Sequence, residues 1–309
     1  MSKILVSGLV NLETTCSVSG FPIEYAPIDY RFFGVNSAVS GVGYNVSKAL
    51  AALGNSVDTA TMLGKDSAGD LALDALKNCG INCAHAVRCM EQTPASVVLY
   101  DGDGRRRIYC DLKDIQERSY DFGGVDVSEY DAAAVCNINF SRPLLHKAKQ
   151  AGIPVATDVH VLSSIDDEYN REFMECADIL FLSDEGLPCE PRNFLMQIEQ
   201  RYGNKIIILG QGGNGALMYL RAEGKFYDFS AVRVGEIINT VGAGDSLFSA
   251  FVSMYVEGMH PIECLKRAEI FASNKICSNG ASNGFVSRNE LEKLYCGFGG
   301  GIAVNDNLT

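Results

Sequence analysis

The chain has 309 residues, of which 47% are hydrophobic and 21% are charged. This balance is ordinary for a globular protein and excludes wholesale disorder. The formal net charge of −12 repels phosphate backbones, so we expect no nucleic-acid partner. No apolar run reaches the roughly 20 residues of a membrane span, and the segment after Lys3 lacks the length and cleavage site of a signal peptide. We therefore expect a cytoplasmic protein without a membrane partner.

Short apolar segments alternate with helix-length segments along most of the chain. This alternation predicts an α/β fold, with a central, mostly parallel sheet flanked by helices on both faces. The strand-like segments are residues 3–9, 57–63, 132–138, 154–158, 178–182 and 205–209, and the helical segments of the C-terminal third are residues 244–256, 261–278 and 287–294.

Two stretches break this alternation. Residues 12–40 are aromatic and turn-rich, and residues 95–110 read as two strands joined by the turn sequence Asp101–Gly104. Both predict strands of a small β-sheet that stands off the main sheet, which is a common way to build an active-site lid. Because no linker divides the chain, we expect a single domain over residues 1–309, with lid strands within about 12–40 and 95–110.

The sequence Gly242-Ala243-Gly244-Asp245 stands directly before an apolar stripe with helical spacing. These residues are therefore expected where a loop becomes a helix N-terminus, and free backbone N–H groups and the helix dipole bind anions at such a place. Asp245 has two interpretations. It is either a side chain that favours the first helical turn or a general base that takes a proton from an attacking hydroxyl. The residues alone leave both open.

Two common nucleotide-binding fingerprints are absent from the sequence. No G-x-x-x-x-G-K-[ST] loop occurs, which argues against a P-loop enzyme. Gly8 has no companion glycines after the first strand, and Gly41-Val42-Gly43 lacks the third glycine of the dinucleotide-binding motif. An NAD-dependent dehydrogenase is therefore a less favoured alternative.

From residue 4 to about residue 284, the chain resembles the ribokinase or PfkB family of carbohydrate kinases. The most specific part is Asn239–Asp245, which is similar to the family signature D-T-x-G-A-G-D with Asn239 in place of the first Asp. The resemblance implies a ribokinase-like fold with a small β-sheet lid. It also implies that the amides of Gly242, Ala243 and Gly244 form an anion hole for the transferred γ-phosphate, with Asp245 as the catalytic base.

The resemblance also identifies candidate substrate-binding residues. The sequence from Gly41 to Asn45 is similar to the family's sugar-binding loop G-G-x-x-x-N, which assigns Gly41, Gly43 and Asn45 to the substrate. Glu13 follows the first strand at the place of an acidic sugar ligand that is usually Asp. Asn139 stands where ribokinase carries a sugar-binding Glu. The changes at Glu13 and Asn139 indicate a substrate other than simple ribose.

The resemblance also assigns residues to the nucleotide-binding site. Gly212 and Gly215 belong to a turn that is similar to the family's nucleotide-binding turn. Asn274, Asn279 and Gly280 fall where the family lines its adenine pocket. The resemblance therefore implies ATP as the phosphoryl donor.

The resemblance also implies binding sites for two cations. The family motif N-x-x-E, which helps to place Mg²⁺, appears here as Ser183-Asp184-Glu185-Gly186, so that Asp184 or Glu185 would serve from one residue away. The family often builds a monovalent-cation site from the loop that begins at residue 239. K⁺ is therefore a candidate, although Asn239 replaces the usual Asp.

These features predict an ATP-dependent small-molecule kinase that phosphorylates a hydroxyl of a sugar. A nucleoside kinase of the same fold is the alternative, because aromatic side chains in the expected lid are suited to stack on a base. The same side chains equally suit packing within the lid sheet or at a dimer contact. A sugar phosphate held by the run of three arginines ranks third, a non-catalytic binding protein ranks lower, and the resemblance implies a homodimer through the lid. The aromatic residues are Phe21, Tyr25, Tyr30, Phe32 and Phe33.

Overall fold

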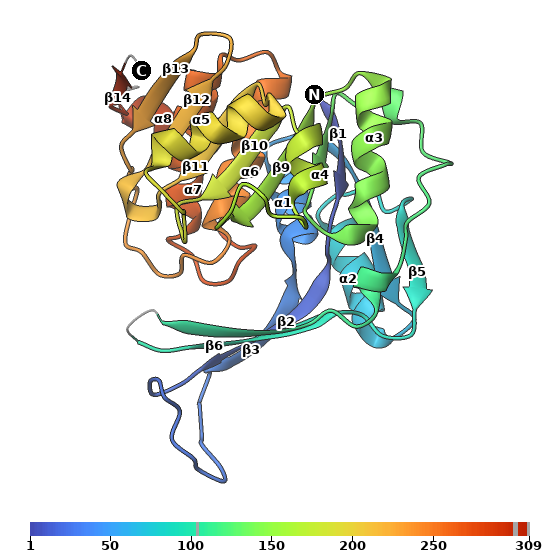
Figure 1. The fold of residues 1–309 in the computed structure, drawn as a ribbon. Helices are drawn as coiled ribbons and strands as arrows, with labels where there is room; N and C mark the ends of the chain where they lie inside the picture. Colours follow the sequence, from blue (N-terminus) through green and yellow to red (C-terminus); the bar gives the residue numbers. More distant parts are fainter. Residues whose placement is uncertain (103–104, 299–301, 308–309) are drawn as a thin grey trace.

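The computed structural model describes residues 1–102, 105–298 and 302–307, so that Asp103 and Gly104 of the expected turn lie outside the described residues. A large sheet forms the centre of the molecule (Figure 1). Its strands are β1 (Lys3–Ser7), β4 (Ser56–Gly64), β5 (Ala86–Met90), β8 (Ala132–Val135), β9 (Val155–Val161), β10 (Ile179–Ser183), β11 (Ile206–Gly210), β12 (Ala216–Leu220), β13 (Lys225–Phe229) and β14 (Val304–Asn307).

The strands of the large sheet lie in the order β14-β13-β12-β11-β10-β9-β8-β1-β4-β5. Neighbours from β11 to β5 pair in parallel, whereas β12, β13 and β14 pair antiparallel at one edge. The prediction of a mostly parallel sheet is therefore confirmed. The carboxyl ends of the parallel strands meet at one edge of the sheet, which is where ligands bind in such folds.

Helices cover both faces of this sheet. Successive strand residues point to opposite faces, so that Ile4 and Val6 join one buried cluster and Leu5 joins the other. The first cluster is covered by α1 (Val42–Ala52), α2 (Ser67–Asn78), α6 (Ala243–Val256), α7 (Pro261–Lys275) and α8 (Arg288–Gly297), and the second by α3 (Arg142–Ala151), α4 (Arg171–Cys176) and α5 (Pro191–Tyr202).

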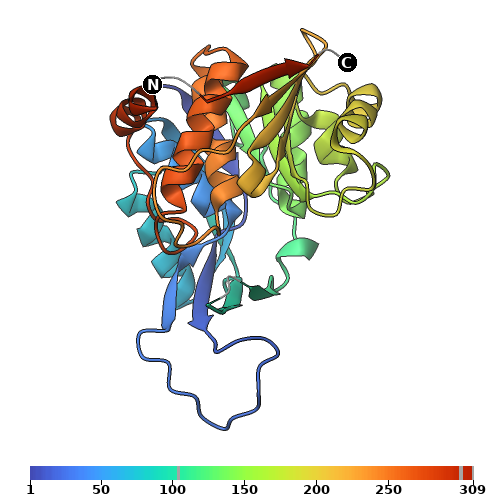
Figure 2. The same cartoon turned by 90° about the vertical axis from the view of Figure 1, so that its left-hand side faces the viewer.

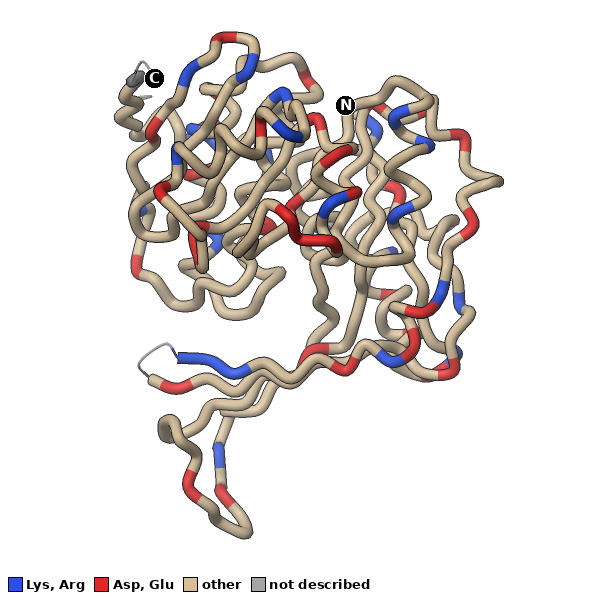
Figure 3. The backbone as a smooth tube through the Cα atoms, viewed as in Figure 1, with Lys and Arg blue, Asp and Glu red and all other residues tan. Residues whose placement is uncertain are grey.

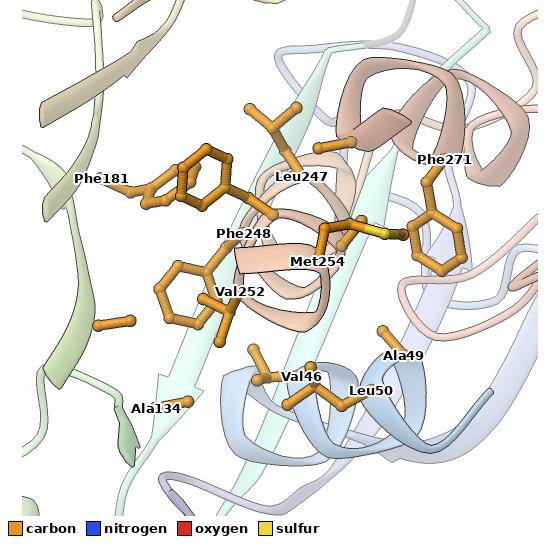
Figure 4. Packing of buried hydrophobic residues seen from close by; sticks show 14 of the residues in the cluster. Val46, Ala49, Leu50, Ala134, Phe181, Leu247, Phe248, Val252, Met254 and Phe271 are labelled. Carbon is orange, nitrogen blue, oxygen red and sulfur yellow. The ribbon is translucent and has the colours of Figure 1, made fainter. Parts of the chain in front are cut away.

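Helix α6 lies in the middle of the first cluster. The rings of Phe248 and Phe251 meet Phe181 of β10 edge-on, with centroids 5.2 and 5.5 Å apart. Figure 4 shows α6 above Val46 and Leu50 of α1, with the side chain of Phe248 directed towards Phe181. Edge-to-face contacts of this kind add to the energy of simple burial. The N-terminus of α6 is consequently held in a fixed position.

The expected small sheet is present and stands off the body of the molecule. Its strands pair in the order β3-β2-β6-β7, and β2 starts four residues after the carboxyl end of β1. Figures 1 and 2 show this sheet below the main sheet, on the side to which β1 points. Its strands are β2 (Asn11–Ser17), β3 (Val35–Ser40), β6 (Ala95–Tyr100) and β7 (Arg106–Asp111).

Residues 18–34 connect β2 to β3 in a long loop that extends beyond the small sheet, away from the body (Figure 2). Its aromatic side chains are exposed: Tyr25 is 93%, Tyr30 75%, Phe32 85% and Phe33 100% accessible. Tyr30 and Phe32 stack on each other, with ring centroids 6.2 Å apart. The interpretation that these four side chains pack within the lid sheet of the same chain is therefore wrong, because the loop does not fold back onto the sheet.

Charged residues of both signs are distributed over the whole chain (Figure 3). The arginine run is the blue stretch at the end of the small sheet. Arg105 pairs with the buried Asp101 at 2.8 Å, and the Arg107 guanidinium lies 5.0 Å from the centroid of the Tyr109 ring. In the described part of the chain, no helix is long and apolar enough to cross a membrane.

Glu269 of α7 is a buried carboxyl group, with only 8% of its surface exposed. Burial raises the pKa of Glu269 to about 8. Its proton is therefore retained in the folded protein at a pH at which the unfolded chain has already lost it.

We expect Glu269→Gln to raise the Tm more at pH 8 than at pH 5. The unfolded carboxyl ionises near 4.5, whereas the folded one keeps its proton up to about 8. The wild-type protein therefore loses stability as the pH rises between these values, and glutamine removes that loss. Differential scanning fluorimetry from pH 5 to pH 8 checks this, with the exposed Glu168→Gln as control. An equal gain at every pH would contradict the expectation.

Candidate active site

The N-terminus of α6 forms a tight turn around Gly242. This residue has a φ of 80°, in the left-handed region that glycine adopts readily. A Cβ atom there would lie 2.2 Å from the Ala281 carbonyl oxygen, so that the loop after α7 rests directly on the turn. Of the three amides predicted to form the anion hole, that of Ala243 already donates to Thr240 O at 3.2 Å. Those of Gly242 and Gly244 have no backbone partner in the described part of the chain, as expected at a helix start.

Asp245 lies in the first turn of α6 and is 9% exposed. Its Oδ2 accepts a hydrogen bond of 2.7 Å from Asn45 Nδ2, and its carboxylate makes no capping bond to the helix amides within the described residues. Burial raises the pKa of Asp245, against the opposing effects of the Asn45 hydrogen bond and the charge of His160. A more basic, oriented carboxylate suits proton abstraction, so the geometry favours the general base over the cap.

Asn45 has a second polar side-chain atom, Oδ1, besides the Nδ2 that donates to Asp245. Its side chain is buried, and Oδ1 has no hydrogen-bond partner among the described residues. A buried carbonyl oxygen without a partner costs free energy that a ligand hydroxyl would recover by donating to it. The predicted substrate ligand Asn45 is thus next to the predicted base.

The glycines before Asn45 allow α1 to start directly against the end of β1. Gly41 has a φ of 97°, and a Cβ there would lie 2.6 Å from Leu9 O. A Cβ on Gly43 would lie 2.5 Å from the carbonyl carbon of Gly8. Gly41 and Gly43 therefore bring Asn45 to the site through backbone packing.

A cavity of about 170 Å³ lies between the small sheet and the loop after α7. Glu13 and Ser40 line it from the small sheet, and Asn279, Gly280 and Ala281 from the loop. Burial is the main cause that raises the pKa of Glu13, and the negative charge of Asp245 raises it further. Glu13 therefore lies within electrostatic reach of the predicted base.

The residues predicted to line the adenine pocket are divided between two hollows. Asn279 and Gly280 border the same cavity as Glu13. Asn274 borders a separate groove of about 420 Å³ between α7 and α8, and its Nδ2 donates to Gly284 O at 3.0 Å. Among them, Asn279 is directly tied to the signature loop, because its Oδ1 accepts from Asn239 Nδ2 at 3.1 Å.

The structure does not bring Asn139 into this cluster. Asn139 Nδ2 donates to Gln116 O at 3.0 Å, and its Oδ1 accepts from Arg142 Nε at 3.1 Å. Both ends of the amide are occupied by neighbouring protein groups. A role for Asn139 in substrate binding stays a prediction.

The loops after β10 and β11 are neighbours at the same sheet edge. Asp184 N donates to Gly210 O at 3.0 Å, and both Asp184 and Glu185 reach solvent. In the turn after β11, Gly212 has a φ of 54° and Gly215 a φ of 98°, and a Cβ on Gly215 would lie 1.9 Å from Phe229 O. Only glycine fits at Gly215.

The donor set near Asp184 and Glu185 suits a hard cation that shares its shell with phosphates. Mg²⁺ usually takes one or two protein carboxylates and completes its shell with phosphate and water oxygens. Within the described ranges, no three His, Cys, Asp or Glu side chains gather as a metal cluster. Two carboxylates are compatible with Mg²⁺ delivered together with a nucleotide.

Two residues that the sequence reasoning left without a role lie at the end of β9. His160 N donates to Asp158 Oδ1 at 2.8 Å, and the ring Nδ1 lies 3.5 Å from Oδ2. A Cβ on Gly244 would lie 3.9 Å from Asp158 Oδ2, which places the pair beside the start of α6. The charge of Asp158 raises the pKa of His160 to about 9, so the ring is a cation at neutral pH. The signal that identifies them is their place after a parallel strand.

His160 also has an unusual backbone. Its φ is 59°, in the left-handed region that costs a non-glycine residue roughly 1 kcal/mol or more. The hydrogen bond from its own N–H to Asp158 holds this conformation. Strain of this kind at a sheet edge accords with a functional position.

A third unassigned residue is Lys275 at the end of α7. Its side chain is fully buried, and Nζ donates to the carbonyl oxygen of Val241. Burial lowers the pKa of Lys275 to about 8, against the opposing charges of Asp245 and Glu13. A cation thus lies beneath the signature loop.

Comparison with known proteins identifies the family. Residues 1–288 match the model of the pfkB family carbohydrate kinases. The chain belongs to this family. A ribokinase of Arabidopsis thaliana is 25% identical over 315 residues, which cover 94% of this chain and 80% of that protein. The structure of Arabidopsis thaliana ribokinase complexed with ribose and ATP covers 95% of this chain and 98% of its own, with a TM-score of 0.79 and 22% identity.

Other solved structures share the fold. A microbiome-derived acarbose kinase has a TM-score of 0.87 and 23% identity, covering 96% of this chain and 99% of its own. A nucleoside kinase of Burkholderia thailandensis in complex with inosine has a TM-score of 0.79 and 18% identity over 96% and 99% of the two chains. As a PfkB carbohydrate kinase, the protein is a phosphotransferase with an alcohol group as acceptor. The dehydrogenase and the non-catalytic binding protein are therefore set aside.

We expect the His160 imidazole of this PfkB kinase to titrate near pH 9, and to titrate at lower pH in Asp158→Asn. The Asp158 carboxylate is the largest cause of the raised pKa, and asparagine removes its charge. NMR of the four histidine rings against pH measures both values, with His160→Gln identifying the resonance. The control is His146, which pairs instead with Glu172 at 2.6 Å and should be unaffected. An unchanged titration of His160 would contradict the pairing.

Proposed function

We propose that this protein transfers the γ-phosphate of ATP to a hydroxyl group of a sugar. One observation carries the proposal. The buried carboxylate of Asp245 is held by Asn45 at the N-terminus of a helix, and the free Oδ1 of Asn45 lies in the same site. A hydrogen-bond acceptor for a substrate hydroxyl, a proton acceptor and the N-terminus of a helix therefore lie close together, and phosphoryl transfer to a hydroxyl would use all three.

The proposed chemistry follows from these positions. As the acceptor oxygen attacks phosphorus, its proton passes to the carboxylate of Asp245. Charge that develops on the transferred phosphoryl group is stabilised by the amides of Gly242 and Gly244 and by the α6 dipole. The His160 imidazolium adds positive charge next to the same carboxylate. Positioning and electrostatics would supply most of the rate.

The acceptor is proposed to lie in the cavity that Glu13 lines. There, Glu13 would accept hydrogen bonds from sugar hydroxyls, and Asn45 Oδ1, which does not line the cavity itself, would accept one more from the hydroxyl next to Asp245. The cavity of about 170 Å³ is smaller than the roughly 300–1,000 Å³ of pockets for drug-sized ligands. This size favours a monosaccharide over a nucleoside. The exposed aromatic side chains of the loop 18–34 do not line this cavity, which removes the argument for base stacking.

ATP is proposed to bind along the neighbouring strand ends. Gly212 and Gly215 would let its phosphates approach the backbone closely, and Asn274 would contact the nucleotide from the groove between α7 and α8. Asn279 and Gly280, which also border the cavity of Glu13, would lie between the nucleotide and the acceptor. The carboxylates of Asp184 and Glu185 would hold Mg²⁺, which, when bound, neutralises part of the phosphate charge.

We expect a panel of pentoses and ketohexoses with ATP and Mg²⁺ to include an acceptor that supports ADP release. Asp245→Asn should lower kcat by about 10³-fold or more, because asparagine cannot take the proton, while ATP affinity stays within about threefold. An enzyme-coupled ADP assay and isothermal titration measure the two quantities. The exposed Asp74→Asn serves as the matched control.

Three outcomes would contradict this expectation. Near-normal turnover in Asp245→Asn would show that Asp245 is not the catalytic base. If adenosine or inosine supports ADP release and none of the sugars does, the acceptor is a nucleoside and not a sugar. A sugar phosphate as the only acceptor would likewise overturn the free-sugar proposal.

We also propose that two copies of the chain pair through the small sheet and its loop. A group of exposed large apolar side chains on one face usually marks an interaction site. Here Tyr25, Ile28, Tyr30, Phe32 and Phe33 are all more than half exposed on the loop 18–34. The proposal accounts for an apolar loop that does not pack against its own sheet.

We expect Phe32→Ser combined with Phe33→Ser to convert a dimer into a monomer, because the pair buries two phenyl groups at the contact. Light scattering after size-exclusion chromatography gives the mass directly. The partly exposed Phe298→Ser on the main body is the control and should leave the dimer intact. A monomeric wild-type protein would contradict the pairing.

A further inference from the structure

Lys275 is a fully buried lysine outside the roles assigned above. Its ammonium donates to the carbonyl oxygen of Val241. The opposite charges within electrostatic reach are Asp245 of α6 and Glu13 of β2. A buried ammonium is costly unless it is paired and hydrogen-bonded, so the site retains this cation at a cost that a neutral side chain would avoid.

The carbonyl that Lys275 binds belongs to the peptide group between Val241 and Gly242. A trans peptide is planar, and its C=O and N–H point in opposite directions. By holding the Val241 oxygen towards the interior, Lys275 directs the Gly242 N–H the other way. Among the described residues, that N–H is one of the two amides at the start of α6 for which no backbone partner is found. Lys275 therefore sets the orientation of an anion-binding amide.

Lys275 is itself held close to this loop. The next residue, Ile276, accepts backbone hydrogen bonds from Ile238 at 2.9 Å and Asn239 at 3.1 Å. Two main-chain hydrogen bonds thus join the end of α7 to the start of the signature loop, next to the lysine contact. The ammonium has a defined position against the loop.

A monovalent metal ion does not fit the same place. Such an ion is bound by carbonyl and carboxylate oxygens, but residue 239 is a neutral asparagine. Both ends of its amide are used, since Oδ1 accepts from Val241 N at 2.8 Å and Nδ2 donates to Asn279 at 3.1 Å. The Val241 oxygen is already bonded to Lys275. The K⁺ expected from the family resemblance therefore finds no carboxylate at residue 239, and the Val241 carbonyl is already used by Lys275.

We propose that the ammonium of Lys275 is a built-in cation of the phosphoryl-transfer loop, which positions the Gly242 amide and makes the enzyme independent of K⁺. Lys275 is a positioning residue, since it acts through the Val241–Gly242 peptide. The inference rests on the proposed kinase function and specifies what that site requires.

The first test compares the wild-type turnover in KCl, NaCl, CsCl and choline chloride at equal ionic strength. The rates are expected to agree within about twofold, because non-specific screening is the same in all four salts. A rate at least tenfold higher in KCl than in choline chloride would overturn the proposal.

The second test removes the charge. Lys275→Met, of similar length, should lower kcat by about 100-fold or more while the KM values stay within about threefold, which is the pattern of a lost transition-state interaction. Lys275→Arg should recover part of kcat. Lys266→Met is the matched control on the same helix, because Lys266 is also partly buried but pairs with Glu263 at 2.8 Å, and its kcat should equal that of the wild type. An active Lys275→Met, or an effect on KM alone, would overturn the positioning role.

The third test needs no turnover. Lys275→Ala leaves a space that a cation can fill, so its Tm should rise by about 2 °C or more in KCl or ethylammonium chloride relative to choline chloride. The wild-type Tm should be the same in KCl and in choline chloride. A K⁺-specific rise in the wild-type Tm would overturn the proposal, even if no acceptor supports turnover and the kinase function fails. If Lys275→Ala does not fold, the wild-type comparison and Lys275→Arg decide.

Discussion

The hydrogen bond between Asn45 and Asp245 is the contact on which the site depends. It joins the first turns of two helices whose residues are 200 positions apart in the sequence. Neither end is free to move: α1 starts against the glycine-lined end of β1, and α6 is packed into the core by its phenylalanines. A carboxylate buried and oriented in this way is more basic than one in water, at no cost of reorganisation during the reaction.

The same burial gathers several charges in a small volume. The carboxylates of Asp245, Glu13 and Asp158 lie with the cations of His160 and Lys275, and each group changes the pKa of at least one other. In a poorly solvated site, opposite charges must lie close together for both to persist. In the proposed reaction, the two cations would allow a carboxylate base to coexist with an incoming, highly charged phosphate group.

The loop of the small sheet differs from the main body in the exposure of its apolar side chains. The body buries two continuous apolar clusters, one on each face of the large sheet. The loop 18–34 instead presents its aromatic side chains to solvent. Because Glu13 lies on this small sheet and borders the cavity, any movement or pairing of the sheet would act directly on the acceptor side of the site.

Local sequence patterns were sufficient to predict the helices and strands and to identify the motif that ends at Asp245. The parallel strands and the C-terminal helices were predicted from apolar periodicity, because each is a local consequence of which face a residue buries. The position of Asp245 at a helix start followed from the glycines before it. The hydrogen bonds of Asn139 could not be read from such patterns: the family resemblance assigned it to the substrate, and in the structure both ends of its amide bond to protein groups.

What only the tertiary structure decided is how distant groups meet. The sequence determined that a helix starts at the glycines with a carboxylate in its first turn, and it predicted an anion site there, since glycine spacing and helical periodicity are properties of neighbouring residues. It did not show that Lys275 reaches the Val241 carbonyl, that His160 is paired with Asp158, or that the lid aromatics remain exposed. Those facts arise from the order of strands and from helix packing, which bring together side chains with no regular spacing along the chain.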